Sequence, residues 1–502
     1  MEVPTAFLYW LAGVLVVLAD VGAALHALMN KRDPYAAIVW VALCLSLPIA
    51  GPLLYVIFGV NRIHRRASKL MKRSRRRAGP STLSAPAGEN APHSDVYHGP
   101  QEVSQDELPP EIRTIAGIGY AVTGIPLLAG NRVSVFYNGE QAYPAMLEAI
   151  GNAKTSVWLD TYIFDNDTTG KVFVDALAAA RERGLDVRVQ VDGLGTMTTW
   201  PRIDKALRKR GISVARFLPP QLVPPQFFIN LRNHRKLLII DGKVAFTGGM
   251  NISDMHRLDR PKRKGVRGFL DRFRTTAFQD IHFRMEGPVL EDFQLVFARE
   301  WSFTAREELV LPDVDDTSAG NVLCRTILDG PDDYFERFHS TLLGVISAAQ
   351  HSVHIMTPYF LPQRELVTAL RSAAMRGVDV AIILPVETDE LLVKWAGGNI
   401  LWELVGRGVH VYLQPPPFAH SKLLLVDGVY SHVGSANLDP RSLRLNFELT
   451  VECFDRTLAT ELEDHFDAIR KVSKELTPDD LASRPFLIRL RDAFCWLFSP
   501  YL

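Results

Sequence analysis

The feature that most constrains the fold of this chain is an internal duplication. Four short patterns recur in the same order about 190 residues later. They are Ser156–Phe164 with Ser352–Phe360, Arg183–Val191 with Arg376–Leu384, Gly211–Val214 with Gly408–Val411, and His234–Gly242 with His420–Gly428. Such a repeat predicts two copies of one structural unit that pack about a pseudo-twofold axis.

Within each copy, helical stretches alternate with short apolar runs. Residues Val172–Gly184 and Arg364–Gly377 have helical periodicity and end at a glycine. The runs that follow are rich in β-branched residues, as expected of strands buried on both faces. We therefore predict an α/β fold with two pseudo-symmetric α/β/α sandwich halves.

Two long apolar segments precede this body. Thr5–Met29 is broken only by Asp20 and His26, and Tyr35–Val60 has no charged residue. Each is long enough to cross about 30 Å of hydrocarbon, so residues 1–60 are predicted to form two transmembrane helices. A buried helical hairpin of a soluble core is the alternative. A cleaved signal peptide fits poorly, because Met1–Pro4 has no basic residue.

Basic residues on the flanks of these segments predict their orientation. The short connection contains Lys31 and Arg32. After the second segment come nine basic residues and no acidic one: Arg62, Arg65, Arg66, Lys69, Lys72, Arg73, Arg75, Arg76 and Arg77. The positive-inside rule places this stretch and the body in the cytoplasm, at the inner membrane, with a multi-pass topology. The same run should attract anionic lipids.

The remaining boundaries follow from composition. Residues 61–110 form the polybasic segment and a tether rich in Pro, Ser, Gly and acidic residues. The first half is predicted at 111–308, a linker at 309–332 and the second half at 333–483. Residues 484–502 form an amphipathic C-terminal segment, predicted to lie at the membrane interface or to pack on the body.

Overall composition excludes several classes of protein. Lysine plus arginine balance aspartate plus glutamate at 56 each, so net charge gives no general attraction to nucleic acid. A hydrophobic fraction of 47% excludes an intrinsically disordered chain. The four cysteines form no CxxC pair, which argues against a zinc cage or a disulfide framework.

The chemistry lies in the repeated pattern His-x-Lys-x4-Asp. Its members are the candidate catalytic residues His234, Lys236, Asp241, His420, Lys422 and Asp427. Side chains two apart in a strand point to the same face, so each copy offers an imidazole beside an ammonium group. Two imidazoles supply a nucleophile and a general acid. Each aspartate precedes a glycine, so support of a turn is as good an interpretation as chemistry.

Small residues and amides follow each pattern. Gly249 and Asn251 in the first copy correspond to Ser435 and Asn437 in the second. With the two lysines, they predict a cradle that binds a phosphoryl group without a metal or other cofactor.

Each imidazole also needs an acceptor that fixes its tautomer. We assign Asp280 to His234 and Glu448 to His420. Tyr162 and Tyr359, at the ends of matched strands, either line the pocket or pack. The other histidines, His256 among them, are assigned structural roles.

Both motifs resemble those of the phospholipase D superfamily, and the chain as a whole resembles bacterial cardiolipin synthases. The resemblance includes Lys31–Pro34, Phe58–Arg62, Ala277–Pro288 and Gly434–Glu448. A basic and aromatic insertion at 257–276 departs from the family pattern and leaves membrane docking open.

The resemblance implies a phosphatidyltransferase that joins two phosphatidylglycerol molecules into cardiolipin and glycerol. The reaction passes through a phosphatidyl-histidine. By analogy His234 is the nucleophile and His420 the acid and base, although the pseudo-symmetry leaves the reverse open. Other head-group reactions stay open, namely hydrolysis of the phospholipase D type and exchange with another acceptor such as phosphatidylethanolamine. A nucleic-acid phosphodiesterase and a non-catalytic scaffold are weaker alternatives. The expected partners are phosphatidylglycerol and the anionic lipids of the membrane, and no nucleic acid. The sequence leaves the oligomeric state open, a homo-oligomer included.

Overall fold

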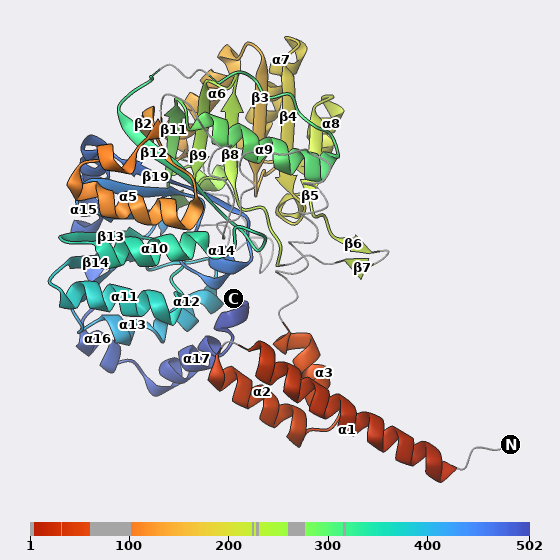
Figure 1. Cartoon of the computed structure of the whole chain (residues 1–502). Coiled ribbons are helices and arrows are strands. Elements are labelled where there is room, and N and C mark those ends of the chain that lie inside the picture. Colours follow the sequence, from red (N-terminus) through yellow and green to blue (C-terminus); the bar gives the residue numbers. More distant parts are fainter. Residues whose placement is uncertain are drawn as a thin grey trace. The chain divides into compact units, whose positions relative to one another are not determined.

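The computed structural model divides the chain into two compact units, residues 1–67 and 68–502. It describes residues 5–31, 33–60, 102–222, 225–226, 230–259, 277–314 and 318–502. The polybasic run, most of the tether and most of the 257–276 insertion lie outside these residues. The two units are therefore described separately (Figure 1).

The N-terminal unit corrects the prediction of two spanning helices. Helix α1 (Thr5–Asn30) is about 39 Å long at 1.5 Å per residue, enough to cross a membrane. The second apolar segment instead forms α2 (Pro34–Ser46), α3 (Ala50–Leu54) and the π-helical turn η1 (Tyr55–Gly59). The Trp40 and Tyr55 rings lie 5.3 Å apart, whereas a straight helix would separate these residues by about 22 Å. The segment therefore folds back on itself, and neither arm is long enough to cross.

Proline explains the reversal. Leu47 precedes Pro48 and leaves the helical region, with φ −121° and ψ 85°, as a residue before proline favours. Ile49 then takes a φ of 67°. Its backbone N–H donates to the buried carboxylate of Asp20 at 3.2 Å. The acidic residue inside α1 thus satisfies a backbone donor at the start of α3.

The body is built on one sheet of sixteen strands. Along the sheet their order is β20-β15-β14-β13-β17-β18-β19-β12-β2-β11-β9-β8-β3-β4-β5, with β1 on β2. The first-half strands are β1 (Glu102–Val103), β2 (Leu127–Tyr137), β3 (Ser156–Thr161), β4 (Asp186–Asp192), β5 (Ser213–Phe217), β8 (Lys236–Ile240), β9 (Val244–Gly248) and β11 (Ile281–Glu286). The second-half strands are β12 (Val322–Asp329), β13 (Ser352–Met356), β14 (Asp379–Pro385), β15 (Val409–Gln414), β17 (Leu423–Val426), β18 (Tyr430–Gly434), β19 (Glu448–Phe454) and β20 (Lys474–Glu475). Outward from the central antiparallel pair β2 and β12, six strands follow in the same order on each side, and β20 adds one further strand to the second half. The predicted pseudo-symmetry is therefore confirmed.

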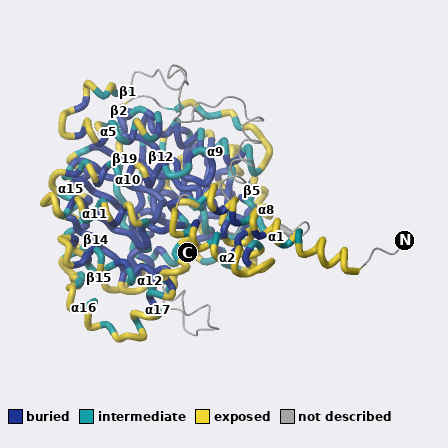
Figure 2. The backbone as a smooth tube through the Cα atoms, turned by 60° about the horizontal axis from the view of Figure 1, so that its bottom comes forward, coloured by how far each residue is buried: buried dark blue, intermediate teal, exposed yellow. Residues whose placement is uncertain are grey.

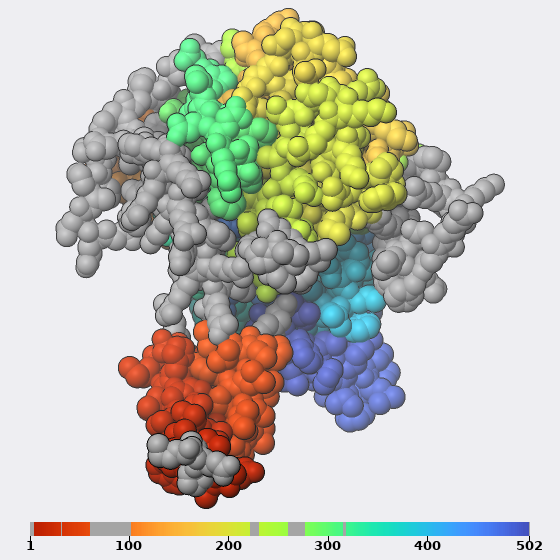
Figure 3. Space-filling view, turned by 90° about the vertical axis from the view of Figure 1, so that its right-hand side faces the viewer, coloured from red at the N-terminus to blue at the C-terminus, as the bar shows by residue number. Residues whose placement is uncertain are grey.

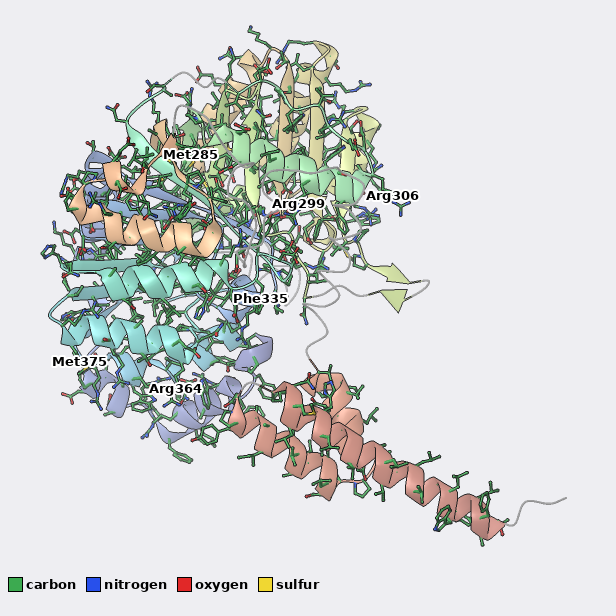
Figure 4. All side chains as sticks on the ribbon, in the orientation of Figure 1. Met285, Arg299, Arg306, Phe335, Arg364 and Met375 are labelled. Atoms are coloured by element: carbon green, nitrogen blue, oxygen red, sulfur yellow. The ribbon has the colours of Figure 1, made fainter. Side chains whose placement is uncertain are left out.

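Helices cover both faces of each half. The first half has α6 (Asn138–Asn152), α7 (Thr168–Glu182), α8 (Ile203–Lys209) and α9 (Leu290–Ala305). The second has α10 (Arg337–Ala348), α11 (Arg364–Met375), α12 (Leu391–Gly398), α13 (Leu401–Leu404), α14 (Pro440–Arg444), α15 (Arg456–Val472), α16 (Pro478–Ala482) and α17 (Phe486–Trp496). Figure 4 labels Arg364 and Met375, which mark the ends of α11. Helices α7 and α11 confirm the predicted helical stretches.

Strand residues alternate between two apolar cores. In β3, Val157 and Leu159 pack with α6 and α7, whereas Trp158 stacks on Phe297 of α9 at 5.2 Å. In the second half, Leu424 packs with the α10 and α11 side, and Leu425 with the α15 side. Each half is therefore the three-layer sandwich predicted from its apolar strands.

Two segments depart from the predicted domain boundaries. The linker predicted at 309–332 contains β12, a central strand of the sheet. Helix α5 (Pro110–Thr123), assigned to the first half, packs its apolar face with the core of the second half beside α10 (Figure 1). The halves are also joined by Arg299 of α9, labelled in Figure 4, which donates to Asp332 at 2.9 Å. The body is thus one interlocked structure.

The aspartate of each repeated motif closes a hairpin. Asp241 and Gly242 both have positive φ, 55° and 65°, as do Asp427 and Gly428, which is typical of a tight hairpin turn. The Asp241 carboxylate accepts hydrogen bonds from the N–H groups of Lys154, Thr155 and Ser156, at 2.7 to 2.9 Å. Asp427 does the same for residues 350–352. These carboxylates therefore tie a hairpin to the start of the neighbouring strand.

We predict that Asp241→Ala destabilises the body by about 2 kcal/mol, because three backbone donors lose their acceptor. Thermal unfolding of the full chain in detergent measures this, and Asp427→Ala should give a similar loss. Folded Asp241→Ala protein should retain the activity of the wild type. An unchanged melting temperature with lost turnover would contradict this structural role.

Candidate active site

The two motif histidines lie where the halves exchange short strand segments. β10 (Phe278–Gln279), from the first half, runs parallel to β16 (Phe418–Ala419), just before His420. In the matching place Asn233, just before His234, bridges Phe447 of the second half. The N–H of His234 donates to the Phe447 carbonyl at 2.9 Å, and that of His420 to the Gln279 carbonyl at 2.7 Å. Each histidine is therefore held by backbone of the opposite half.

The same exchange decides which carboxylate orients which imidazole. His234 Nδ1 lies 3.0 Å from both carboxylate oxygens of Glu448. His420 Nδ1 lies 2.7 Å from Asp280 Oδ2. Our assignment of Asp280 to His234 and Glu448 to His420 is therefore wrong: each pair joins the two halves. Since Nδ1 is engaged in both rings, each Nε2 is the atom left for chemistry.

Glu448 is an ionised carboxylate in a buried site. Burial would raise its pKa, but His234, Lys236 and the Ser435 hydroxyl outweigh it and lower the pKa of Glu448. Ser435 Oγ donates to Glu448 Oε2 at 2.5 Å, and Asn446 Nδ2 donates to Oε1 at 3.3 Å. Burial lowers the pKa of His234, and Glu448 opposes that effect. The carboxylate thus favours the imidazolium form of His234.

Both motif lysines lie beside the histidines and are buried. Lys236 Nζ donates to the His234 carbonyl at 2.5 Å, and Lys422 Nζ lies 2.9 Å from His420 Nδ1. Burial lowers the pKa of Lys236 to about 7 and that of Lys422 to about 8, although Glu448 and Asp280 raise both. A bound phosphate anion would favour the ammonium forms. The pair is therefore suited to a phosphodiester.

The residues of the predicted phosphate cradle lie at the site, but several of them hold other site residues in place instead of facing the space for the phosphate. A Cβ at Gly249 would lie 2.3 Å from Asp280 Oδ1, so only glycine lets this carboxylate reach His420. The Ser435 hydroxyl donates its hydrogen bond to Glu448, and Asn251 Oδ1 accepts one from the Ile163 N–H at 3.1 Å. The buried Asn437 Oδ1 has no hydrogen-bond partner among the described residues.

Asp241 and Asp427 do not reach the site, which corrects their place among the catalytic candidates. Each lies at the far end of its strand, about 16 Å along the chain from the motif lysine. Their hydrogen bonds to backbone N–H groups are those of the hairpins described above.

His256 is a site residue that the sequence analysis assigned to a structural role. Its Nε2 accepts the Asn251 N–H at 3.2 Å, its Nδ1 lies 3.7 Å from Asp280 Oδ2, and its ring lies 5.7 Å from that of His420. Burial lowers its pKa well below the usual value, which favours the neutral ring. His256 belongs to no sequence motif. It comes near Asp280, which lies 24 residues later in the chain, only through the tertiary fold.

His256, Asp280 and His420 also place three ligand atoms within 4.8 Å of one another. That spacing would suit a metal ion, but Lys422 Nζ lies 2.9 and 3.2 Å from the two ring nitrogens of His420. A cation there would be repelled by the ammonium group and would compete with the bond from His420 to Asp280. These residues therefore fit an imidazole–carboxylate pair better than a metal centre.

Behind His234 lies a buried polar network that has no counterpart at His420 among the described residues. Asn233 Nδ2 donates to Asp160 and Glu300, and Arg235 pairs with Glu300 and donates to the Glu448 carbonyl at 3.2 Å. Around His420 the corresponding positions are Ala419 and Ser421. The residues that flank the two histidines therefore differ in the sequence, and this difference could have predicted that the two sites are not equivalent.

The matched tyrosines face the histidines. The Tyr162 ring lies 5.1 Å from His234 and under Lys236 Nζ at 5.5 Å. The Tyr359 ring lies 6.3 Å from His420, and its hydroxyl donates to Asp389 at 2.6 Å. Both therefore line the site.

Comparison with known families agrees with this geometry. Residues 146–257 and 342–470 match the family described as "Cardiolipin synthase, PLD-like domain", and residues 18–59 match a phospholipase D-nuclease N-terminal family. The major cardiolipin synthase ClsA of Bacillus subtilis is 31% identical over 94% of this chain and 95% of its own length. Cardiolipin synthase A of Pseudomonas putida is 32% identical over 99% of this chain and 98% of its own.

Among solved structures, the phosphatidylserine synthase of Haemophilus influenzae aligns with a TM-score of 0.60. The alignment covers 77% of this chain and all of that protein, at 14% identity. This likeness concerns the fold alone.

We predict that Glu448→Gln lowers the pKa of His234, because the carboxylate is what raises it against burial. Turnover should fall by about 10²- to 10⁴-fold, as when a triad loses its orienting carboxylate. Titration of ¹⁵N-labelled imidazoles by NMR measures the first effect. Asp280→Asn is the matched variant for His420. A shift at His420 instead of His234 would refute the crossed pairing.

Proposed function

This chain belongs to the cardiolipin synthase family of phosphatidyltransferases, and on that premise we propose how its duplicated site transfers a phosphatidyl group. The observation that carries the proposal is the crossed pairing of His234 with Glu448 and of His420 with Asp280. It leaves two Nε2 atoms for one phosphodiester, with an ammonium group beside each ring. Phosphatidylglycerol is the proposed donor.

In the first step, His234 Nε2 attacks the phosphorus of phosphatidylglycerol. A P–N bond forms, and the P–O bond to the glycerol head group breaks. His420 gives a proton from Nε2 to the departing glycerol oxygen. Burial and the nearby Lys422 lower the pKa of His420, so its protonated form is a strong acid. Lys236 and Lys422 stabilise the charge that builds on the non-bridging oxygens. The products are phosphatidyl-His234 and free glycerol.

In the second step, a second phosphatidylglycerol provides a head-group hydroxyl. Neutral His420 takes its proton, the oxygen attacks phosphorus, and the P–N bond breaks to give cardiolipin. Water in place of this hydroxyl would give phosphatidic acid. The acceptor therefore decides between synthesis and hydrolysis, whereas the site chemistry is the same.

Incubation of the purified chain with phosphatidylglycerol alone tests the reaction, and we predict cardiolipin and glycerol as products. His234→Ala and His420→Ala should each abolish synthesis. Phosphatidic acid as the only lipid product would favour hydrolysis instead.

A phosphatidyl ester of p-nitrophenol distinguishes the roles of the two histidines, because this leaving group needs no acid. His420→Ala should then release one equivalent of p-nitrophenol and stall with lipid on His234. His234→Ala should release none. The opposite pattern would show that His420 is the nucleophile and His234 the acid and base, and the overall reaction would be the same.

The chain is a membrane protein, and we propose that α1 crosses the membrane once while α2 to η1 form a re-entrant hairpin. Such a hairpin begins and ends on one side. Lys31, Arg32 and the nine basic residues at 62–77 then share that side, the cytoplasmic one by the positive-inside rule. The body lies on the same side.

Impermeant maleimide labelling in intact cells tests this topology in a variant that lacks the native cysteines. We predict that Asn30→Cys is labelled only after lysis, as is the body control Met375→Cys, which is exposed. Two spanning helices would instead expose position 30 to the outside, with Met375→Cys still protected.

A further inference from the structure

A cavity of about 340 Å³ lies in the second half, between α12, the α16–α17 segment and the carboxyl ends of β13 to β15. Its size is within the range of small-molecule sites. Its apolar walls include Phe360, Leu384, Val393, Leu401, Leu413 and Leu481. Figure 3 shows the C-terminal segment in blue against the lighter blue α12 region, and α17 packs on α12.

Tyr359 connects this cavity to the reacting groups. Its side chain lines the cavity, and its ring meets the His420 ring edge-on at 6.3 Å. Thr388, which also lines the cavity, directly precedes Asp389, the acceptor of the Tyr359 hydroxyl. A molecule in the cavity is therefore one side chain away from the imidazole.

Cationic side chains line the wall formed by α12 and α17. Asp492, which is buried, pairs with both Arg484 and Arg491, so one carboxylate is shared by two guanidinium groups. Arg491 also stacks on Trp395 at 4.4 Å. Lys394 Nζ donates to the Val386 carbonyl at 2.5 Å. Burial, and to a lesser extent the nearby Arg491, lowers the pKa of Lys394.

The outer face of α17 is apolar and exposed. Phe486, Leu490, Phe494 and Leu497 recur at helical spacing and are 53 to 73% exposed. In Figure 2 most of α16 and α17 carries the colour of exposed residues. One helix thus carries an apolar surface suited to a lipid interface outside and the cationic cavity wall inside.

We propose that this cavity binds one anionic phospholipid, with an acyl chain along the apolar walls and the phosphate directed past Tyr359 to the motif lysines. Lys394 and Arg491 line the path and attract the negative charge of the lipid. The proposal rests on the proposed function, because it identifies where a phosphatidylglycerol lies while its head group meets His420. Charge complementarity selects the anionic head group, and α17 provides the entry from the bilayer. The apolar walls make the affinity depend on chain length.

A series of short-chain phosphatidylglycerols, kept below their micelle concentrations, tests the cavity in the full-length enzyme. We expect kcat/KM to rise by up to about fourfold for each added methylene, which corresponds to ~0.8 kcal/mol. Leu401→Trp and Leu413→Trp fill the cavity and should flatten this dependence. Leu392→Trp is the matched control, because Leu392 is on α12 but 51% exposed and outside the cavity.

Bis(p-nitrophenyl) phosphate, a soluble diester without chains, reports the site chemistry and should be cleaved equally by wild type and filled variants. Filled variants that keep the wild-type chain-length dependence would overturn the proposal, as would an equal loss in Leu392→Trp. If both tryptophan variants fail to fold, the double variant Lys394→Gln/Arg491→Gln decides. We expect about tenfold lower kcat/KM for phosphatidylglycerol with unchanged diester cleavage, and unchanged kcat/KM would overturn the proposal.

The test is independent of the product formed. The chain-length series follows total consumption of phosphatidylglycerol, whether the product is cardiolipin or phosphatidic acid. Cardiolipin formation by the wild type tests the proposed function, whereas the slope of the series tests the cavity. Either can fail while the other stands.

Discussion

The structure depends on the exchange of carboxylates between the two halves. His234 is oriented by Glu448 and His420 by Asp280, and backbone bonds from Phe447 and Gln279 hold the same two histidines. Each motif histidine is therefore oriented by a carboxylate from the opposite half. The site therefore forms at the interface between the halves, which also share one continuous sheet and interlock through α5 and β12.

Burial at this interface sets the electrostatics of the site. Two lysines, two histidines and two carboxylates are removed from water, where their mutual interactions are stronger than at a surface. Burial lowers the pKa of Lys236 to about 7 and that of Lys422 to about 8, so both ammonium groups are stabilised most when an anion lies between them. The charged forms of these two lysines are thus favoured more when a phosphodiester is bound than when the site holds no anion.

Pseudo-symmetry in the backbone is not carried through in the side chains. A buried network of Asn233, Arg235 and Glu300 supports the strand of His234, whereas His420 has His256 and Phe278 against its ring. The cationic cavity behind Tyr359 belongs to the second half. A duplicated fold can therefore give its two histidines different roles through the residues around them.

The sequence by itself determined the duplication, the sandwich halves, the paired His-x-Lys motifs and the family, because these follow from local patterns and spacing. It could not determine which carboxylate serves which histidine, since Asp280 and Glu448 each follow their own motif along the chain but meet the opposite one in space. Nor could it place His256, or separate the hairpin role of Asp241 from chemistry. The hydropathy of the second apolar segment predicts a membrane-spanning helix, yet the segment turns at Pro48 and its two arms pack together through Trp40 and Tyr55. Tertiary structure decided these points because each depends on contacts between residues distant in sequence, which periodicity does not encode.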